Sequence, residues 1–301
     1  GFRLRRPAIA SVLLALMAGL AAAVAAVGAL AGNPGLAGEF VMGGWPRGVG
    51  INLRIDGYAA ILILLVYGVS SLILLHTMGE ERRNALFFAI YAVALTGMIG
   101  VILTADLFNL FVFFAVLSLT AAILVAFDRT LPAMQAAFRY LLVSTLAIAL
   151  YLVALFLIYR ATGELSFSAI SRVLAAAAGG DAPAVLTADI ALAGALIFGA
   201  LATRVALIPF PAWLPEAHGQ APTPVSALLS GLMLKAAFIA TWRILSLLPG
   251  AVLLDTLAWV GGLSAILGAL FALMQEDAKR LLAYSSISQI GYITAASGAG
   301  A

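Results

Sequence analysis

Long apolar runs separated by short polar breaks set the pattern of this chain. Nine runs are long and apolar enough to cross a bilayer, which takes about 20 residues; Ala and Leu dominate them, and strand signals are absent. The pattern predicts an all-α fold, a polytopic transmembrane helix bundle with about nine spanning helices. The nine runs occupy roughly residues 8–32, 54–76, 84–104, 106–128, 132–160, 187–208, 221–247, 251–275 and 279–299.

The ends of the sequence bear on its domain organisation. The first residue is Gly1 rather than Met, and Ala301 follows a helix-like apolar run that has no polar tail. No composition shift within the chain marks a soluble domain. We therefore expect residues 1–301 to form a single transmembrane domain that is truncated at both ends.

Composition narrows the class further. Hydrophobic residues make up 64% of the 301 and charged residues 10%, whereas a soluble domain carries about 25% charge. With a mean hydropathy of +1.14, the chain must use lipid as its solvent, and we expect a multi-pass protein of the cell inner (plasma) membrane. The net charge of +3 indicates basic cytoplasmic loops and no nucleic-acid partner.

The inventory of chemical groups excludes several kinds of site. The absence of Cys excludes disulfides, thiolate metal sites and Cys nucleophiles, and only two His residues are present. The sequence shows no H-E-x-x-H motif, nucleophile elbow or Gly-rich phosphate loop. We therefore expect no cofactor, no metal and no catalytic residue.

Basic residues on the polar breaks predict the orientation. The nine-helix count places eight Lys and Arg residues on one side of the membrane and five on the other, which favours the first side as cytoplasmic. The first side holds Arg3, Arg5, Arg6, Arg82, Arg83, Arg129, Lys279 and Arg280, and the second holds Arg47, Arg54, Arg160, Arg172 and Arg243.

One segment, residues 198–243, stands out from the apolar pattern. Arg204 and Lys235 lie inside runs long enough to span, and a Pro-rich break between them carries Glu216 and His218. Ionisable groups at membrane depth are costly and usually functional. Broken helices survive there only where protein or water covers their free backbone groups. The segment therefore predicts an ion path.

Three of the ionisable residues in this segment each have a second interpretation. Arg204 precedes Pro209, which breaks the helix, so it either lines the path or snorkels to an interface. Lys235 lies about 21 Å along its helix, and it either exchanges a proton or is a fixed charge paired with a carboxylate. His218 beside Glu216 either relays protons or serves as a hydrogen-bonded loop or cap residue.

Acidic residues are absent from the middle of every predicted span. Asp106 opens the run 106–128, where an N-cap is the favoured role over ion binding. Two buried cations without an interior carboxylate cost several kcal/mol each. Either Lys235 is largely neutral, or water and an end-of-helix acid compensate, or a partner chain supplies the negative charge.

Four stretches carry a resemblance to a known family. Their amino-acid sequences resemble those of the antiporter-like proton-translocating subunits of respiratory complex I, membrane-bound hydrogenases and Mrp cation/proton antiporters. They are most similar to the D-type Mrp subunit. The stretches are GGWPRGVGINLRIDG at 43–57, LTADLFNLFVFF at 103–114, PAWLPEAHGQAPTPVSALLSGLMLKAAF at 211–238 and EDAKRLLAYSSISQIGYI at 276–293.

The resemblance implies an inverted-repeat fold with a broken helix in each repeat, a general transporter design. It implies that Lys235 matches the eighth-helix Lys of the family and that Arg204 stands where the seventh-helix Lys belongs. Ala115 occupies the position of the fifth-helix Glu. Further positions that match family motifs are Asp106, Pro209, His218, Pro222, Pro224, Lys279, Ser286 and Gln289.

These departures shape the functional hypothesis. Ala115 has no charge, and an Arg keeps its proton in proteins. We expect a membrane subunit of a multisubunit cation/proton-translocating complex that conducts or gates H⁺ through the buried Lys and Arg, with attenuated or altered proton transfer. Its expected partners are other membrane subunits, protons, Na⁺ as a candidate second ion, and lipid.

Two other functions remain open at this stage. The chain is alternatively a structural membrane subunit without its own ion path, in which Arg204 is a fixed charge. A stand-alone carrier for an anion, attracted by unpaired Arg204 and Lys235, is a third possibility.

Overall fold

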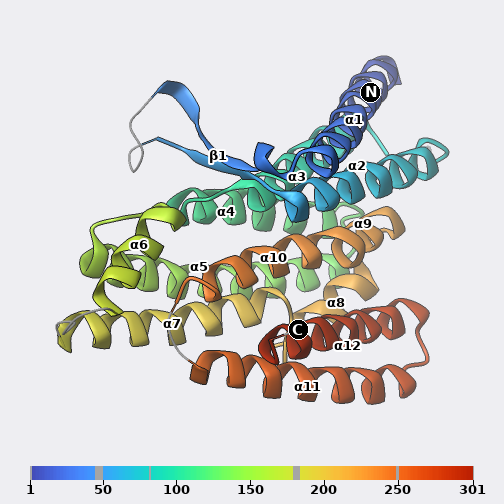
Figure 1. Cartoon of the computed structure of the whole chain (residues 1–301). Coiled ribbons are helices and arrows are strands. Elements are labelled where there is room, and N and C mark those ends of the chain that lie inside the picture. Colours follow the sequence, from blue (N-terminus) through green and yellow to red (C-terminus); the bar gives the residue numbers. More distant parts are fainter. Residues whose placement is uncertain (1, 45–49, 81–82, 179–183, 249–250, 301) are drawn as a thin grey trace.

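The computed structural model describes residues 2–44, 50–80, 83–178, 184–248 and 251–300. Long helices lie side by side with their axes along a common direction, and α1 is inclined to them (Figure 1). The predicted helical bundle is confirmed. The helices are α1 (Phe2–Gly32), α2 (Gly57–Met78), α3 (Ala85–Leu103), α4 (Leu107–Val125), α5 (Leu131–Thr162), α6 (Phe167–Ala178), α7 (Ala184–Arg204), α8 (Trp213–Gln220), α9 (Thr223–Leu228), α10 (Leu234–Leu245), α11 (Ala251–Leu273) and α12 (Ala278–Gly298).

Among the described residues, 7 helical segments are long and apolar enough to cross a membrane. They correspond to predicted runs one to five, seven and eight. The segment that matches predicted run seven, Thr223–Leu245, joins α9 and α10 through a π-helical segment, Leu229–Met233. The predicted runs 187–208 and 279–299 fold as α7 and α12, which do not belong to that set. For these two, membrane crossing stays a prediction.

The expectation that the chain has no strands is wrong at one place. Strands β1 (Gly38–Val41) and β2 (Asn52–Ile55) form an antiparallel hairpin, in the register Gly38 opposite Ile55. Each strand has only four residues, which is too short for an alternating pattern to stand out. The hairpin is fixed by tertiary contact, because Leu53 forms a bridge with Thr104 at the end of α3.

Side-chain caps explain why acidic residues fall at the ends of the apolar runs. Asp56 accepts from the Ala59 amide at 2.8 Å and Asp277 from the Arg280 amide at 2.9 Å, at the starts of α2 and α12. Such oxygens satisfy amides that the first helical turn leaves free. Capping matters more in a membrane than in water, because lipid cannot form a hydrogen bond with an uncapped amide.

The two ends of the bundle are held by different ion pairs. The end with the β hairpin and α6, which we call the hairpin side, has Arg243 of α10 paired with Asp56 at 2.8 Å. The opposite end, the Arg83 side, has Arg83 paired with Asp128 at 2.5 Å. Burial works against the charge of Arg83, but Asp128 and Glu80 together hold its pKa above the ordinary value. These ion pairs fix the ends of neighbouring helices relative to one another, which apolar contacts alone do less specifically.

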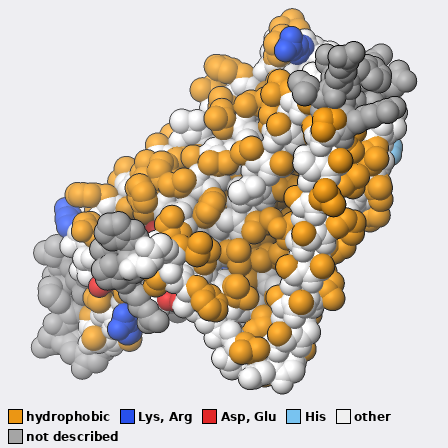
Figure 2. Space-filling model, turned by 90° about the horizontal axis from the view of Figure 1, so that it is seen from above, with side chains coloured by type: hydrophobic (Ala, Val, Ile, Leu, Met, Phe, Trp, Pro, Cys, Tyr) orange, Lys and Arg blue, Asp and Glu red, His pale blue; other side chains and the backbone are white. Residues whose placement is uncertain are grey.

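Hydrophobic side chains cover much of the outer surface. Figure 2 shows them scattered among other atoms over much of the face in view, with Lys and Arg near its extremities. Trp259 and Leu273 of α11 are 81% and 84% exposed. Contiguous apolar surface of this extent fits contact with lipid or with other membrane helices.

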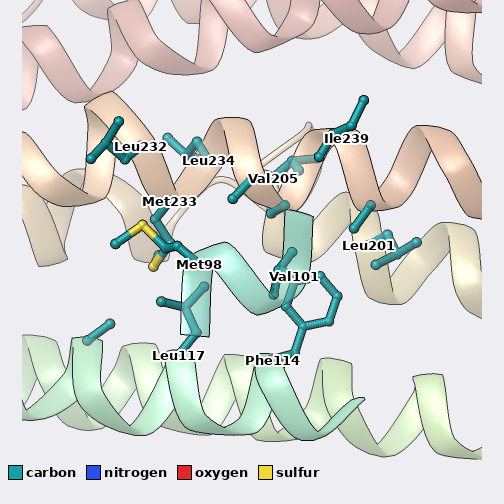
Figure 3. Close-up of a cluster of buried hydrophobic side chains, with 14 of the residues drawn as sticks. Met98, Val101, Phe114, Leu117, Leu201, Val205, Leu232, Met233, Leu234 and Ile239 are labelled. Atoms are coloured by element: carbon teal, nitrogen blue, oxygen red, sulfur yellow. The ribbon is translucent and has the colours of Figure 1, made fainter. Parts of the chain in front are cut away.

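The core lies where α3, α4, α7 and α10 meet. Met98 and Val101 of α3 face Phe114 and Leu117 of α4, and residues from α10 close the cluster (Figure 3). This packing positions the end of α7, and with it Arg204, between α4 and α10.

Helices α11 and α12 pack with their backbones almost touching. A Cβ at Gly291 would lie 2.4 Å from the Ala265 amide nitrogen, whereas a Cβ at Gly262 would meet nothing within 4 Å. Small residues allow such close approach, and van der Waals contact then holds the pair in lipid.

We predict that Gly291→Ala lowers the free energy of unfolding by about 1–3 kcal/mol, because the methyl group forces α11 and α12 apart. Thermal unfolding of the purified protein in detergent measures the loss. Gly262→Ala is the matched control and is expected to be neutral or mildly stabilising. Equal stability of the two variants would contradict the close packing.

Candidate functional site

The predicted break in residues 198–243 is present. Helix α7 ends at Arg204, α8 is a separate short helix, and a cis peptide bond joins Ile208 to Pro209. Protein groups cover backbone atoms freed by the break: Trp213 Nε1 donates to the Thr203 carbonyl at 2.8 Å, and Ser264 Oγ accepts from the Ile208 amide at 3.0 Å. The break is therefore a built element of the bundle.

Arg204 is held by neutral groups of α4. Its Nη1 and Nη2 donate to Ser118 Oγ at 2.9 and 2.8 Å, and Nη2 also donates to the Phe114 carbonyl at 2.8 Å. The guanidinium carbon lies 4.1 Å from the centroid of the Phe114 ring, a cation–π distance. Arg204 is thus a bound charge, and its polar head turns into the bundle.

Ala115 lies beside this contact. It follows Phe114, is half-buried, and stands three residues before Ser118 on α4. Among the described residues, no Asp or Glu oxygen forms an ion pair with Arg204 or Lys235. Neutral acceptors compensate Arg204, an arrangement that the sequence did not indicate.

Lys235 is the second residue after the π-helical segment, which ends at Met233. Its Nζ donates to the Ser230 carbonyl at 2.5 Å, and the residue is half-buried. A π segment inserts a wider turn into an α-helix and is frequent at functional sites. Nothing in the sequence indicated it beyond Gly231, which lies within the segment.

Glu216 and His218 of α8 have separate partners. Glu216 pairs with Arg139 of α5 at 2.6 Å and lines a cavity of about 170 Å³ with Gln220 and Arg280. His218 is 1% exposed, with its Nδ1 3.2 Å from Ser226 Oγ, and its buried Nε2 has no hydrogen-bond partner among the residues that the structure describes. Two residues apart on a helix do not face each other, and the contact of His218 with Ser226 fits the alternative of a hydrogen-bonded residue. A relay role for His218 stays a prediction.

The break gathers positive charge around His218. Lys279 donates from Nζ to the Ala221 carbonyl at 2.8 Å, which joins the start of α12 to the end of α8. Both Lys235 and Lys279 lie close enough to His218 to act on it electrostatically. These three residues, which sequence reasoning named separately, therefore share one region.

The remaining motif positions have mainly structural surroundings. Ser286 donates within its own helix to the Leu282 carbonyl at 2.9 Å, and Gln289 is exposed. Pro222 and Pro224 start α9, and Pro209 is exposed in the break. Their parts in an ion path stay predictions.

Asp106 lies apart from the other candidates, at the hairpin end of α4. As the sequence favoured, it caps this helix, accepting from the Asn109 amide at 2.8 Å. It is buried, with 6% of its surface exposed.

Two small cavities flank Arg204. One of about 10 Å³ lies between Arg204, Tyr140, Ser144 and Met233, and a second of about 10 Å³ is lined by Arg204 and Tyr151. Each volume matches a single water molecule. Tyr140, Ser144 and Tyr151 share one face of α5 by their spacing, a pattern that sequence analysis missed because three polar residues in a long apolar run resemble ordinary packing.

The comparisons with known proteins agree with this architecture. A family model described as "NADH:quinone oxidoreductase/Mrp antiporter, TM" matches residues 104–301. The chain belongs to this family. The resemblance drawn from the four stretches is confirmed, and the protein is a membrane protein of the antiporter-like type.

Two members of this family show how much of the chain is matched. The chain is 35% identical over 265 residues to the N-type subunit of NADH-quinone oxidoreductase from Desulforudis audaxviator, covering 85% of this chain and 51% of that relative. It is 32% identical over 260 residues to the D-type subunit of the Na(+)/H(+) antiporter from Alkalihalophilus pseudofirmus, covering 84% and 51%. The chain spans about half the length of the curated relatives it matches.

Solved structures of the same kind share the fold. The archaeal membrane-bound sulfane sulfur reductase matches with a TM-score of 0.86 and 31% identity, over 95% of this chain and 58% of that chain. The Mrp complex of a Dietzia species matches with a TM-score of 0.85 and 27% identity, over 97% and 54%. Respiratory complex I from Thermus thermophilus matches with a TM-score of 0.75 and 29% identity, over 96% and 58%.

We predict that Ser118→Ala destabilises the protein by about 1–3 kcal/mol, because it removes an acceptor from a guanidinium that has little access to water. Thermal unfolding in detergent measures the change. Ser286→Ala is the control, since that hydroxyl bonds only within α12 in the described contacts. If the two variants lose equal stability, Ser118 does not hold Arg204.

Proposed function

We propose that this chain, residues 1–301, is one transmembrane domain of a membrane subunit in a multisubunit cation/proton-translocating complex of the cell inner membrane. Lys235 and the broken segment around His218 carry the proton path, and Arg204 is a fixed positive charge beside it. Other membrane subunits are its partners, and Na⁺ is the candidate second ion, since one relative is named as part of a Na(+)/H(+) antiporter.

The contacts of Arg204 carry the proposal. Three hydrogen bonds to neutral oxygens and one aromatic ring hold the guanidinium in a single position. An Arg keeps its proton throughout the range in which proteins are folded. Arg204 therefore shapes the electrostatic barrier that a proton meets, and it does not carry the proton.

Lys235 is suited to the opposite role. An ammonium group has three donors, and Lys235 directs one of them to the Ser230 carbonyl. A Lys inside a protein changes its charge far more readily than an Arg. Helix neighbours of Lys235 line the cavity beside Arg204, and its charge acts on His218. Lys235 is therefore placed to be the exchangeable site of the proposed path.

We predict that Lys235→Ala abolishes ion-driven pH change in vesicles that contain the native complex, while the subunits still assemble. Lys235→Arg is the matched control, because it keeps the charge but exchanges protons poorly, and it is expected to fail as well. Loss of assembly in Lys235→Ala would instead support a structural subunit. Full transport by the variant would refute the proposed path.

We predict that the double variant Ala115→Glu with Arg204→Lys transports protons faster than the unchanged protein. The Glu would lie one helical turn from Ser118, beside the new Lys, and an acid next to a Lys tunes its proton affinity. The initial rate of ion-driven pH change in vesicles is the measurement, with each single variant as a control. An unchanged rate in the double variant contradicts the attenuating role of Arg204 and Ala115.

A further inference from the structure

The hairpin side holds a polar cavity that the proposed path does not use. It has a volume of about 470 Å³ and lies between the β hairpin and α6, at the opposite end of the bundle from the cavity beside Glu216. Arg54 and Arg172 line it together with Glu39, which is half-buried. The remaining lining residues are Phe167, Ser168, Ser171 and Leu247.

A chain of hydroxyl groups leads inward from Glu39. Ser168 Oγ donates to Glu39 Oε2 at 2.8 Å, and Ser166 Oγ lies 3.1 Å from Ser168 Oγ. A hydroxyl has one proton to donate, and that of Ser168 is directed at the carboxylate. Ser166 must therefore be the donor in the second bond, so both protons point toward Glu39.

The inner end of this hydroxyl chain lies beside Asp106. Leu107 N donates to the Leu165 carbonyl at 3.0 Å and Phe167 N to the Ala105 carbonyl at 2.9 Å, which makes Asp106 and Ser166 a non-hydrogen-bonded antiparallel pair. In such pairs the two side chains share a face, with Cβ atoms roughly 4.5–5.5 Å apart. Asp106 and Ser166 are 6% and 3% exposed. A buried hydroxyl thus adjoins a buried carboxyl.

From Asp106 the polar route continues toward Arg204. Tyr151 Oη donates to the carbonyl of Leu107, the residue after Asp106, at 2.8 Å. Tyr151 lines the small cavity that also borders Arg204. The hairpin side is therefore connected to the candidate site through groups that can hold or order protons.

We propose that Glu39, Ser168 and Ser166 form a proton-access site on the hairpin side, which exchanges protons between the surface cavity and Asp106. The inference rests on the proposed function, and it adds a second opening of the proton path, on the hairpin side. In the outward direction Asp106 gives its proton to Ser166, Ser166 passes its own to Ser168, and Ser168 passes its own to the Glu39 carboxylate. Both serines end neutral, Asp106 ends ionised and Glu39 ends protonated, and no electron is transferred.

Two charged groups set the environment of Glu39. Arg54, which also pairs with Asp56 at 3.1 Å, and Arg172, which donates to the Ser168 carbonyl at 3.3 Å, both border the cavity. Glu39 thus borders the cavity together with two Arg side chains, at the point where the hydroxyl chain reaches it.

The first test measures access and does not depend on transport. The chain has no Cys, so Ser166→Cys introduces a single thiol into it. The full-length variant is kept in its native complex in vesicles, and Ag⁺ is added on the hairpin side. We expect the thiol to react, and Ser70→Cys, a control buried between α2 and α3 away from the hydroxyl chain, to remain unmodified. Absence of reaction at Ser166→Cys, or equal reaction at Ser70→Cys, would overturn the access site.

The second test measures proton flow. Glu39→Gln keeps an oxygen that accepts from Ser168 but cannot titrate, and we expect it to slow ion-driven pH change by about tenfold. Glu164→Gln, on the same side but outside the hydroxyl chain, is the matched control. A rate for Glu39→Gln equal to that of the control would refute the inference. If Lys235→Ala leaves transport intact, the proposed function fails, whereas the Ag⁺ reaction still decides the access site.

Discussion

The guanidinium of Arg204, placed among apolar helices, is the constraint on which the rest of the structure depends. Taking such a charge from water costs several kcal/mol unless its donors are satisfied. Helix α4 meets that demand with the Ser118 hydroxyl, the Phe114 carbonyl and the Phe114 ring. The contact fixes the end of α7 against α4. Pro209 breaks the chain locally after Arg204, and the contact with α4 sets where that helix end lies in the bundle.

Polar groups continue away from this charge in both directions. Toward the Arg83 side lie Lys235, His218 and the cavity beside Glu216. Toward the hairpin side lie Tyr151 and Asp106. The apolar core of α3, α4, α7 and α10 surrounds the centre and keeps lipid from the polar groups. The positive charge of Arg204 lies between these two groups of polar residues, and the proposed function assigns to it the role of an electrostatic barrier to a cation.

Much of the architecture was predictable because its causes are local. Apolar runs of spanning length, the acids that cap helices, and Pro209 after Arg204 each act within a few residues of chain. The hairpin and the π segment before Lys235 were not predictable. A four-residue strand has too little pattern, and a π turn arises from the packing of a whole helix. The separate partners of Glu216 and His218 depend in turn on which segments α8 packs against.

The sequence by itself determined that the chain folds in lipid as a helical bundle, that its helix breaks near Arg204, and that no acid stands at position 115. Only the tertiary structure decided what stands in for that acid. Ser118 and Phe114 lie 86 and 90 residues from Arg204 in sequence, and the three meet because α4 and α7 pack in one register. Composition and periodicity show whether a helix faces lipid, water or protein. Hydrogen bonds between helices depend on the register in which the helices pack, which composition and periodicity do not give.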